Sequence, residues 1–136
     1  MKTWLITGCS SGLGRGIAEA ALKHGENVAV TARKTEKIKE LAEQYPSQAL
    51  ILKLDLNDRD SMKSAVDCAI RVFGRIDVLV NNAGYGYRAA VEESEPEKVK
   101  ELFDTNFFAP AELMKRVLPV MRAQKSGLIV NVTSIG

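Results

Sequence analysis

The chain has 136 residues, of which 46% are hydrophobic, and its formal net charge is only +2. This length and composition suit one compact domain over residues 1–136 that buries a core of useful size. Lysines and arginines are interspersed with acidic residues, so no basic patch for nucleic acid stands out and we expect a small-molecule partner.

Short apolar runs alternate with longer stretches of helical period along the chain. The runs are rich in β-branched residues and predict five buried strands, at residues 3–6, 27–31, 49–54, 76–80 and 128–132. The stretches between them predict four helices, the clearest of which repeats apolar residues along one face at Met62, Val66, Ala69, Ile70 and Phe73. Strands that are apolar on both faces and alternate with helices predict an α/β fold with a doubly wound, Rossmann-type parallel sheet.

In two predicted helices, particular residues indicate where the helix ends or bends. Lys23 and His24 followed by Gly25 predict a helix C-terminus with a left-handed glycine, so we interpret His24 as a capping residue rather than a general base. The last helix, over residues 96–124, contains Pro110, which predicts a kink that frees backbone groups near Asn106.

The sequence also argues against membrane and metal-binding classes. No apolar run approaches the roughly 20 residues that cross a bilayer, and no charged leader precedes the first apolar run, so we expect a cytoplasmic protein without membrane association. Cys9 and Cys68 lie far apart and have no neighbours spaced as zinc ligands, so we expect neither a disulfide nor a metal site.

A glycine-rich turn, residues 7–14, follows the first predicted strand and opens the first predicted helix. In that position backbone N–H groups and the helix dipole can hold a pyrophosphate. Gly8 would permit a sharp turn, Gly12 would let the backbone approach the phosphates, and Gly14 would allow close packing of helix on strand. The spacing differs from G-x-G-x-x-G and lacks the Gly-Lys-Ser/Thr of a P-loop. An ordinary strand-to-helix turn stays open as the alternative.

Three further segments accompany this turn: Asp55 after the third strand, Asn81-Asn82-Ala83-Gly84 after the fourth, and Asn131-Val132-Thr133-Ser134 at the end of the fifth. With them the whole chain resembles the short-chain dehydrogenase/reductase (SDR) family, and the pairing of TGxxxGxG with NNAG is specific to it. The resemblance implies hydride transfer between a nicotinamide dinucleotide and a carbonyl or alcohol substrate, by a homo-oligomer. It implies cofactor contacts at Gly8, Ser10, Ser11, Gly12, Leu13, Gly14, Arg33, Asp55, Leu56, Asn82, Ala83 and Gly84.

The resemblance gives two of these segments specific roles. It implies that Asp55 accepts a hydrogen bond from the exocyclic amine of adenine; the alternative is that Asp55 caps a helix, although Asn57 and Asp58 lie nearer the next helix start. In the segment 81–84, two amide side chains can tie neighbouring loops together, and Gly84 lets the backbone pass close to the cofactor ribose.

The position after the second strand bears on the choice of nicotinamide cofactor. NAD enzymes usually carry a carboxylate there for the ribose 2′-hydroxyl, but this chain has Ala32. Arg33 follows and could pair with a 2′-phosphate, with Lys34 close by and Arg15 in the first helical turn. We therefore predict NADP(H) as cofactor in preference to NAD(H). The alternative is that Arg33 is a solvated loop cation.

The catalytic residues implied by the resemblance are incomplete in this sequence. Ser134 matches the serine that hydrogen-bonds the reacting oxygen, and Asn106 matches the helix asparagine that supports a water-linked proton relay. The family also needs Tyr-x-x-x-Lys, but Tyr45, Tyr85 and Tyr87 have no lysine four residues on. We therefore expect a truncated form of a longer enzyme, without the C-terminal strands and catalytic helix, that binds cofactor without turnover.

Truncation would also affect packing. We expect the fifth strand to form an open sheet edge and the last helix to lose a neighbour along Leu113, Val117, Val120 and Met121. Two other functions stay open beside the oxidoreductase. One is a non-catalytic dinucleotide-binding module, and the other is epimerisation or dehydration of nucleotide sugars on the same fold, against which Ser134 and the NNAG segment argue.

Overall fold

The computed structural model describes residues 1–134, which form a five-stranded parallel sheet. Its strands are β1 (Thr3–Ile6), β2 (Asn27–Ala32), β3 (Ala49–Lys53), β4 (Val78–Asn81) and β5 (Leu128–Asn131). Their order across the sheet is β3-β2-β1-β4-β5, and every neighbouring pair is parallel. The doubly wound fold and all five predicted strands are confirmed, although several strand ends lie a residue or two from their predicted positions.

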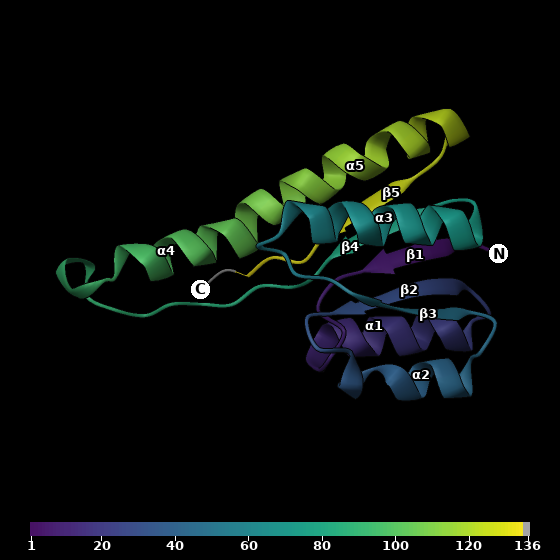
Figure 1. Cartoon of the computed structure of the whole chain (residues 1–136), viewed down its shortest axis with the longest axis horizontal. Helices are drawn as coiled ribbons and strands as arrows, with labels where there is room; N and C mark the ends of the chain where they lie inside the picture. The colour runs from purple at the N-terminus through teal and green to yellow at the C-terminus, as the bar shows by residue number, and fades with distance from the viewer. Residues whose placement is uncertain (135–136) are drawn as a thin grey trace.

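Helices cover both faces of the sheet. They are α1 (Gly12–Lys23), α2 (Lys39–Gln44), α3 (Arg59–Phe73), α4 (Pro96–Phe103) and α5 (Ala109–Gln124), with short 3₁₀ turns η1 (Thr35–Lys37) and η2 (Val91–Glu93). Figure 1 shows α1 and α2 on one side of the sheet and α3 and α5 on the other. Within residues 1–134, no helix combines the length and apolar character needed to cross a bilayer.

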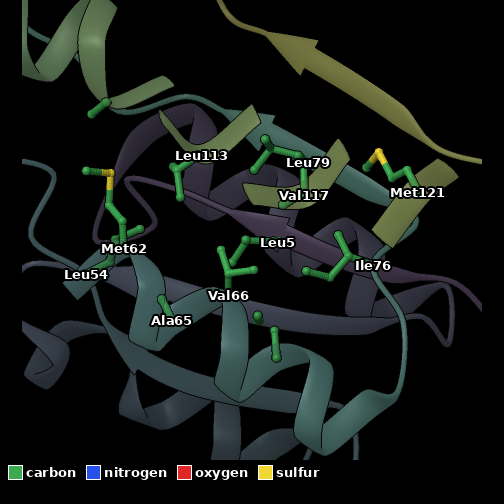
Figure 2. Close-up of a cluster of buried hydrophobic side chains, with 13 residues drawn as sticks. Leu5, Leu54, Met62, Ala65, Val66, Ile76, Leu79, Leu113, Val117 and Met121 are labelled. Atoms are coloured by element: carbon green, nitrogen blue, oxygen red, sulfur yellow. The ribbon is translucent and has the colours of Figure 1, made fainter. Parts of the chain in front are cut away.

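Two cores form because consecutive strand residues point to opposite faces of the sheet. In β1, Leu5 packs in the cluster beneath α3 and α5, which Figure 2 shows, whereas Ile6 packs in the cluster beneath α1 and α2. In β4, Leu79 faces the first cluster and Val80 the second. Burial on both faces explains why these strands read as continuous apolar runs in the sequence.

The helix ends match the residues that flank them. His24 is the C-cap of α1, and the following Gly25 adopts the left-handed conformation with φ of 87°, so the capping interpretation of His24 is confirmed. At the start of α3, the Asp58 carboxylate accepts hydrogen bonds from the N–H groups of Asp60 and Ser61.

The helix predicted over residues 96–124 is interrupted by a π-helical segment, η3 (Asp104–Phe108), between α4 and α5. Pro110 has no N–H to donate to the carbonyl of Asn106, and the N–H of Ala109 bonds the carbonyl of Asp104 instead. The predicted irregularity near Asn106 is confirmed, and it takes the form of a widened helical turn.

The packing of α5 corrects one expectation. Leu113, Val117 and Met121 are buried in the core beneath α3 and α5, so these three side chains are covered within the chain, whereas Val120 is only half-buried and lies outside this core. The open edge is confirmed at β5, which among residues 1–134 pairs with β4 alone and leaves the Leu128 side chain 55% exposed.

Hydrogen bonds tie the strands together at the amino ends of β1 and β4. The buried Asp77 carboxylate accepts the N–H of Thr3 at 2.8 Å and binds both Nε and Nη2 of Arg75. The Arg75 hydrogen bonds lower the pKa of Asp77, against the opposing effect of burial. Nearby, the Gln124 amide at the end of α5 pairs with both backbone groups of Ile76, at 3.1 and 2.9 Å. This edge of the sheet is therefore firmly anchored.

Candidate functional site

A cleft of about 460 Å³ lies at the carboxyl ends of the strands. The chain builds the sheet outward from β1 in one direction with β2 and β3, and in the other direction with β4 and β5. Ligands of doubly wound folds bind at such a reversal point, because the loops there diverge to opposite faces. The cleft is lined by four segments at the ends of strands and by residues of α4 and η3. These are Thr7, Gly8 and Ser10; Thr31 to Arg33; Leu54 to Asn57; Ala83, Tyr85 and Tyr87; Lys98 and Glu101; and Thr105.

The glycine-rich turn forms the base of the cleft. Gly8 and Gly12 have φ of 68° and 62°, a left-handed conformation that side chains other than glycine rarely adopt. Ser11 stands at the N-cap of α1 without a side-chain capping bond, and the first turn of α1 holds no acidic residue. The first N–H groups of this helix therefore lack the usual internal acceptors, as an anion-binding terminus requires. Leu13, in that first turn, is 59% exposed.

Gly14 explains how closely α1 approaches the end of β4. A Cβ on Gly14 would lie 2.3 Å from the carbonyl oxygen of Gly8 and 2.4 Å from Nδ2 of Asn82. The Asn82 amide itself donates to the carbonyls of Thr7 and Gly8, at 3.3 and 3.2 Å. The predicted close packing of helix on strand is therefore present, and it includes the segment after β4.

Thr7 is a site residue that sequence reasoning did not single out. Its buried hydroxyl accepts the N–H groups of Asn82 and Ala83, both at 3.0 Å, and donates to the carbonyl of Val80 at 3.4 Å. A threonine directly before the first glycine of the turn is the only local signal for this role. Thr7 and Asn82 together hold the glycine-rich turn and the NNAG segment in one rigid corner.

The rest of the NNAG segment is tied to two other elements. Nδ2 of Asn81 donates to Oδ1 of Asn131 at 2.9 Å, which links the ends of β4 and β5. A Cβ on Gly84 would lie 3.1 Å from Oδ1 of Asn106, so the close approach at Gly84 is to η3. The prediction that the amide side chains tie neighbouring loops together is confirmed.

The Asn106 side chain pins the loop that crosses the cleft. Its Oδ1 accepts the N–H of Tyr85 at 3.1 Å, and its Nδ2 donates to the carbonyl of Tyr85 at 2.7 Å. The side-chain amide is thus engaged with one backbone unit, whereas the Asn106 carbonyl is the group that Pro110 leaves without its usual donor.

Asp55 lies in the wall of the cleft with Leu56, where its carboxylate accepts the N–H of Asn57 at 2.9 Å. Because Asp58 caps α3, the capping alternative for Asp55 is wrong. One carboxylate oxygen of Asp55 thus shapes the turn that follows it, and Asp55 is among the residues that line the cleft.

Arg33 is exposed at the wall of the cleft, directly after β2. Ala32 also lines the cleft, so the last residue of β2 offers no carboxylate there. Arg15, in contrast, is not among the lining residues, because its guanidinium is bound to Glu19, Glu40 and the carbonyl of Lys37. The expectation that Arg15 adds a cation beside Arg33 is therefore wrong.

Ser134 is one of the predicted site residues that do not line the cleft. It is exposed beyond the carboxyl end of β5 and is not among the lining residues of the cleft. Register places the ends of β4 and β5 side by side, with Asn81 opposite Asn131, so Ser134 follows the same edge of the sheet. The cleft brings together Gly8, Ser10, Arg33, Asp55, Leu56 and Ala83 of the predicted residues.

Sequence reasoning missed the far wall of the cleft. Tyr85 and Tyr87 come from the irregular segment after β4, and Lys98, Glu101 and Thr105 come from α4 and η3. The hydroxyl of Tyr87 accepts the N–H of Glu95 at 3.2 Å, which joins this loop to the start of α4. Nothing in the local sequence signals that α4 faces the turn at residues 7–14, because tertiary packing alone determines it.

Comparison with known proteins matches this chain consistently to one family. The family model described as short chain dehydrogenase matches residues 2–136. Oxidoreductase BOA17 of Botryotinia fuckeliana (strain B05.10) is 42% identical over 136 residues, which cover 99% of this chain and 50% of that protein. The 3-ketodihydrosphingosine reductase of Bacteroides thetaiotaomicron is 39% identical over 132 residues, covering 97% of this chain and 46% of that protein.

Solved structures show the same similarity. A short-chain dehydrogenase from Streptomyces avermitilis superposes with a TM-score of 0.94 at 43% identity, covering 98% of this chain and 49% of that one. A metagenomic short-chain oxidoreductase in complex with NADP has a TM-score of 0.92 at 31% identity, covering 99% of this chain and 63% of that one. The chain thus spans about half the length of the curated relatives it matches.

Proposed function

Because the chain belongs to the short-chain dehydrogenase family, we propose that residues 1–136 form the NADP(H)-binding domain of an oxidoreductase. The enzyme would transfer a hydride between NADP(H) and a carbonyl or alcohol substrate. The observation that carries this proposal is the cleft at the carboxyl ends of β1 and β4, where the strand order reverses, with the uncapped start of α1 at its base and Arg33 at its wall.

The residues present fit a dinucleotide with a 2′-phosphate. At the left-handed Gly12, no atom of residues 1–134 beyond its chain neighbours and the nearby backbone of α1 lies within 4 Å of the place where a Cβ would stand, which leaves room for a pyrophosphate. Ser10 and Gly8 line the same space. Arg33 can form a bidentate pair with a phosphate, and Ala32 offers no carboxylate to repel it.

The remaining contacts extend the proposal along the cleft. Asp55 would accept the adenine amine, with Leu56 beside the ring, and Asn82, Ala83 and Gly84 would border the ribose. The other turn residues, Ser11, Leu13 and Gly14, complete the pyrophosphate site. When bound, the nicotinamide ring supplies or accepts the hydride.

The chain's own residues would hold the reacting groups in place. We assign Ser134 the hydrogen bond to the carbonyl or alcohol oxygen, from its position past the end of β5. Asn106 would hold the loop at Tyr85 through its side chain and offer its carbonyl to a water. No tyrosine of this sequence is followed by lysine at the fourth position, so these 136 residues would bind cofactor without turnover.

Cellular location, oligomeric state and partners are also part of the proposed function. We place it in the cytoplasm, where the two unpaired cysteines of the chain would stay reduced. As in other family members, a homo-oligomer would form through the last helix and the segment that follows it. Its partners would be small-molecule carbonyl or alcohol compounds.

Calorimetric titration of the chain with NADPH and NADH tests the proposal. We expect NADPH to bind more tightly, and Arg33→Ala to weaken NADPH by about tenfold, the loss expected for one charge-assisted hydrogen bond, with NADH little changed. Arg122→Ala, on the exposed end of α5, serves as the control arginine. Tighter binding of NADH would overturn the NADP(H) assignment, and absence of binding by either dinucleotide would overturn the proposed function.

A further inference from the structure

The Arg15 side chain connects three segments beside the cleft. Its Nε donates to Oε1 of Glu19 at 2.7 Å, its Nη1 donates to the carbonyl of Lys37 at 2.6 Å, and its Nη2 pairs with Glu40. The side chain is only 19% exposed. One guanidinium therefore uses all three of its nitrogens to join α1 to the end of η1 and to α2.

The segment that Arg15 holds is the one that follows Arg33. Residues 33–41 leave the end of β2, turn through η1 and enter α2. Ile38 and Leu41 anchor this segment from below, because both are buried in the core under α1. The bond from Arg15 to the Lys37 carbonyl anchors it from the side. Arg33 itself is exposed, so its place at the cleft wall depends on the backbone that carries it.

Arg15 also neutralises two carboxylates near the glycine-rich turn. The hydrogen bonds that Arg15 donates to Glu19 and Glu40 raise the pKa of Arg15, so its charge is committed to these partners. Its charge still reaches the turn, since it acts to lower the pKa of the Cys9 thiol, although burial dominates and raises that pKa. Without Arg15, the carboxylates of Glu19 and Glu40 would lose the cation that both of them pair with.

We propose that Arg15 is a positioning residue for cofactor selectivity, which fixes residues 33–41 so that Arg33 faces the cleft and which cancels the charge of Glu19 and Glu40. The inference rests on the proposed function, namely that this cleft binds NADP(H). It differs from the direct role that its position in the first turn of α1 suggested, because the guanidinium contacts protein groups and not the cleft.

Arg15→Lys separates the two roles. Lysine keeps the positive charge that a direct phosphate ligand needs, but a single ammonium cannot reproduce the planar fork that spans Glu19, Lys37 and Glu40. We expect Arg15→Lys to reduce the preference for NADPH over NADH by about tenfold. The effect should not add to that of Arg33→Ala, because both changes remove the same contact. Arg122→Lys, on α5, is the matched control.

Hydrogen exchange provides a readout that does not depend on cofactor. Arg15→Lys should speed amide exchange within residues 33–41, and Arg122→Lys should leave it unchanged. Glu40→Gln, which removes the α2 partner and leaves Arg15 in place, offers a second route to the same measurement if Arg15→Lys folds poorly.

The outcomes separate this inference from the proposed function. Unchanged exchange in residues 33–41 would overturn the positioning role, whatever binds in the cleft. A wild-type preference for NADPH that persists in Arg15→Lys, or that falls additively with Arg33→Ala, would overturn it while leaving the proposed function intact. If neither dinucleotide binds the wild-type chain, the proposed function fails and the selectivity role fails with it.

Discussion

Asn106 and Tyr85 are joined by a reciprocal pair of hydrogen bonds, in which the side-chain amide of Asn106 serves both the N–H and the carbonyl of Tyr85. The pair links the π-helical turn before α5 to the loop after β4. Substitution of a residue that secures a loop in this way should change stability and local amide exchange, whereas substitution of a residue that only relays protons should not.

Asn106→Leu should therefore loosen the loop as well as affect the chemistry. We expect a loss of about 1 kcal/mol of unfolding free energy, since the two bonds are solvent-accessible, together with faster amide exchange at Tyr85. Asn106→Asp keeps the acceptor for the Tyr85 N–H but sets a carboxylate oxygen against the Tyr85 carbonyl, so it should speed exchange at Tyr85 as well. Equal rates of amide hydrogen exchange at Tyr85 in the wild type and in Asn106→Leu would show that the Asn106 side chain does not secure this loop.

Gly14 and Gly16 of α1 should respond in opposite directions to the same substitution. Gly14→Ala would force a Cβ against the Gly8 carbonyl and should destabilise the chain by about 3 kcal/mol. A Cβ on Gly16 would meet no atom of residues 1–134 within 4 Å beyond its chain neighbours and the nearby backbone of α1, so Gly16→Ala should stabilise the helix by about 1 kcal/mol. Urea unfolding of both variants measures the difference, and equal midpoints would show that the corner between α1 and the NNAG segment is looser than described.

The Asp77 carboxylate should make stability depend on pH in the acid range. Its pKa in the folded chain lies below its ordinary value of 3.8, because Arg75 and the Thr3 N–H bond the charged form. A lowered pKa contributes stability that is complete above the ordinary value and is lost as the pH falls through the folded-state value.

Asp77→Asn tests this linkage. We expect it to cost about 1 to 3 kcal/mol at pH 7, and the gap to wild type should narrow below about pH 4. Asp67→Asn is the control, because Asp67 also has a lowered pKa through Lys63 but lies exposed on α3, where such pairs contribute little. A gap that stays constant down to about pH 2 would contradict the assignment.

The two cysteines should differ sharply in reactivity. Burial raises the pKa of the Cys9 thiol to about 11, and its Sγ donates to the carbonyl of Ile6 at 3.3 Å. Cys68 is partly exposed on α3. Iodoacetamide at about pH 8 should therefore modify one thiol per folded chain, and Cys68→Ser should abolish the reaction until the chain is unfolded in urea. Rapid labelling of Cys9 in the Cys68→Ser variant under native conditions would show that the glycine-rich turn opens.

The sequence predicts the sheet well because its signals are local. Apolar runs at β1 and β4 reflect burial on both faces, and Gly25 marks the end of α1 through its own backbone conformation. The same holds for Gly8 and Gly14 in the turn, whose roles follow from position between a strand and a helix.

The residues whose contacts could not be predicted depend on segments that are distant in the sequence. Arg15 reads as a free cation in the sequence, and only the approach of α2 to α1 supplies Glu40 and the Lys37 carbonyl as its partners. The hydroxyl of Thr7 finds its partners in the segment after β4, far along the chain. Such pairings arise from tertiary packing, for which local propensity has no signal.

The polar anchors Asp77 and Gln124 lie at the amino edge of the sheet, and the cleft lies at the carboxyl edge. The sheet thus separates the residues that maintain it from the residues that can meet a ligand. Substitutions at Arg33 or Asp55 that alter ligand preference should therefore cost little stability. Where such a substitution does destabilise the fold, a stabilising substitution near Asp77 can offset the loss. This division of labour would let one scaffold be retuned for new chemistry, by evolution or by engineering, in small independent steps.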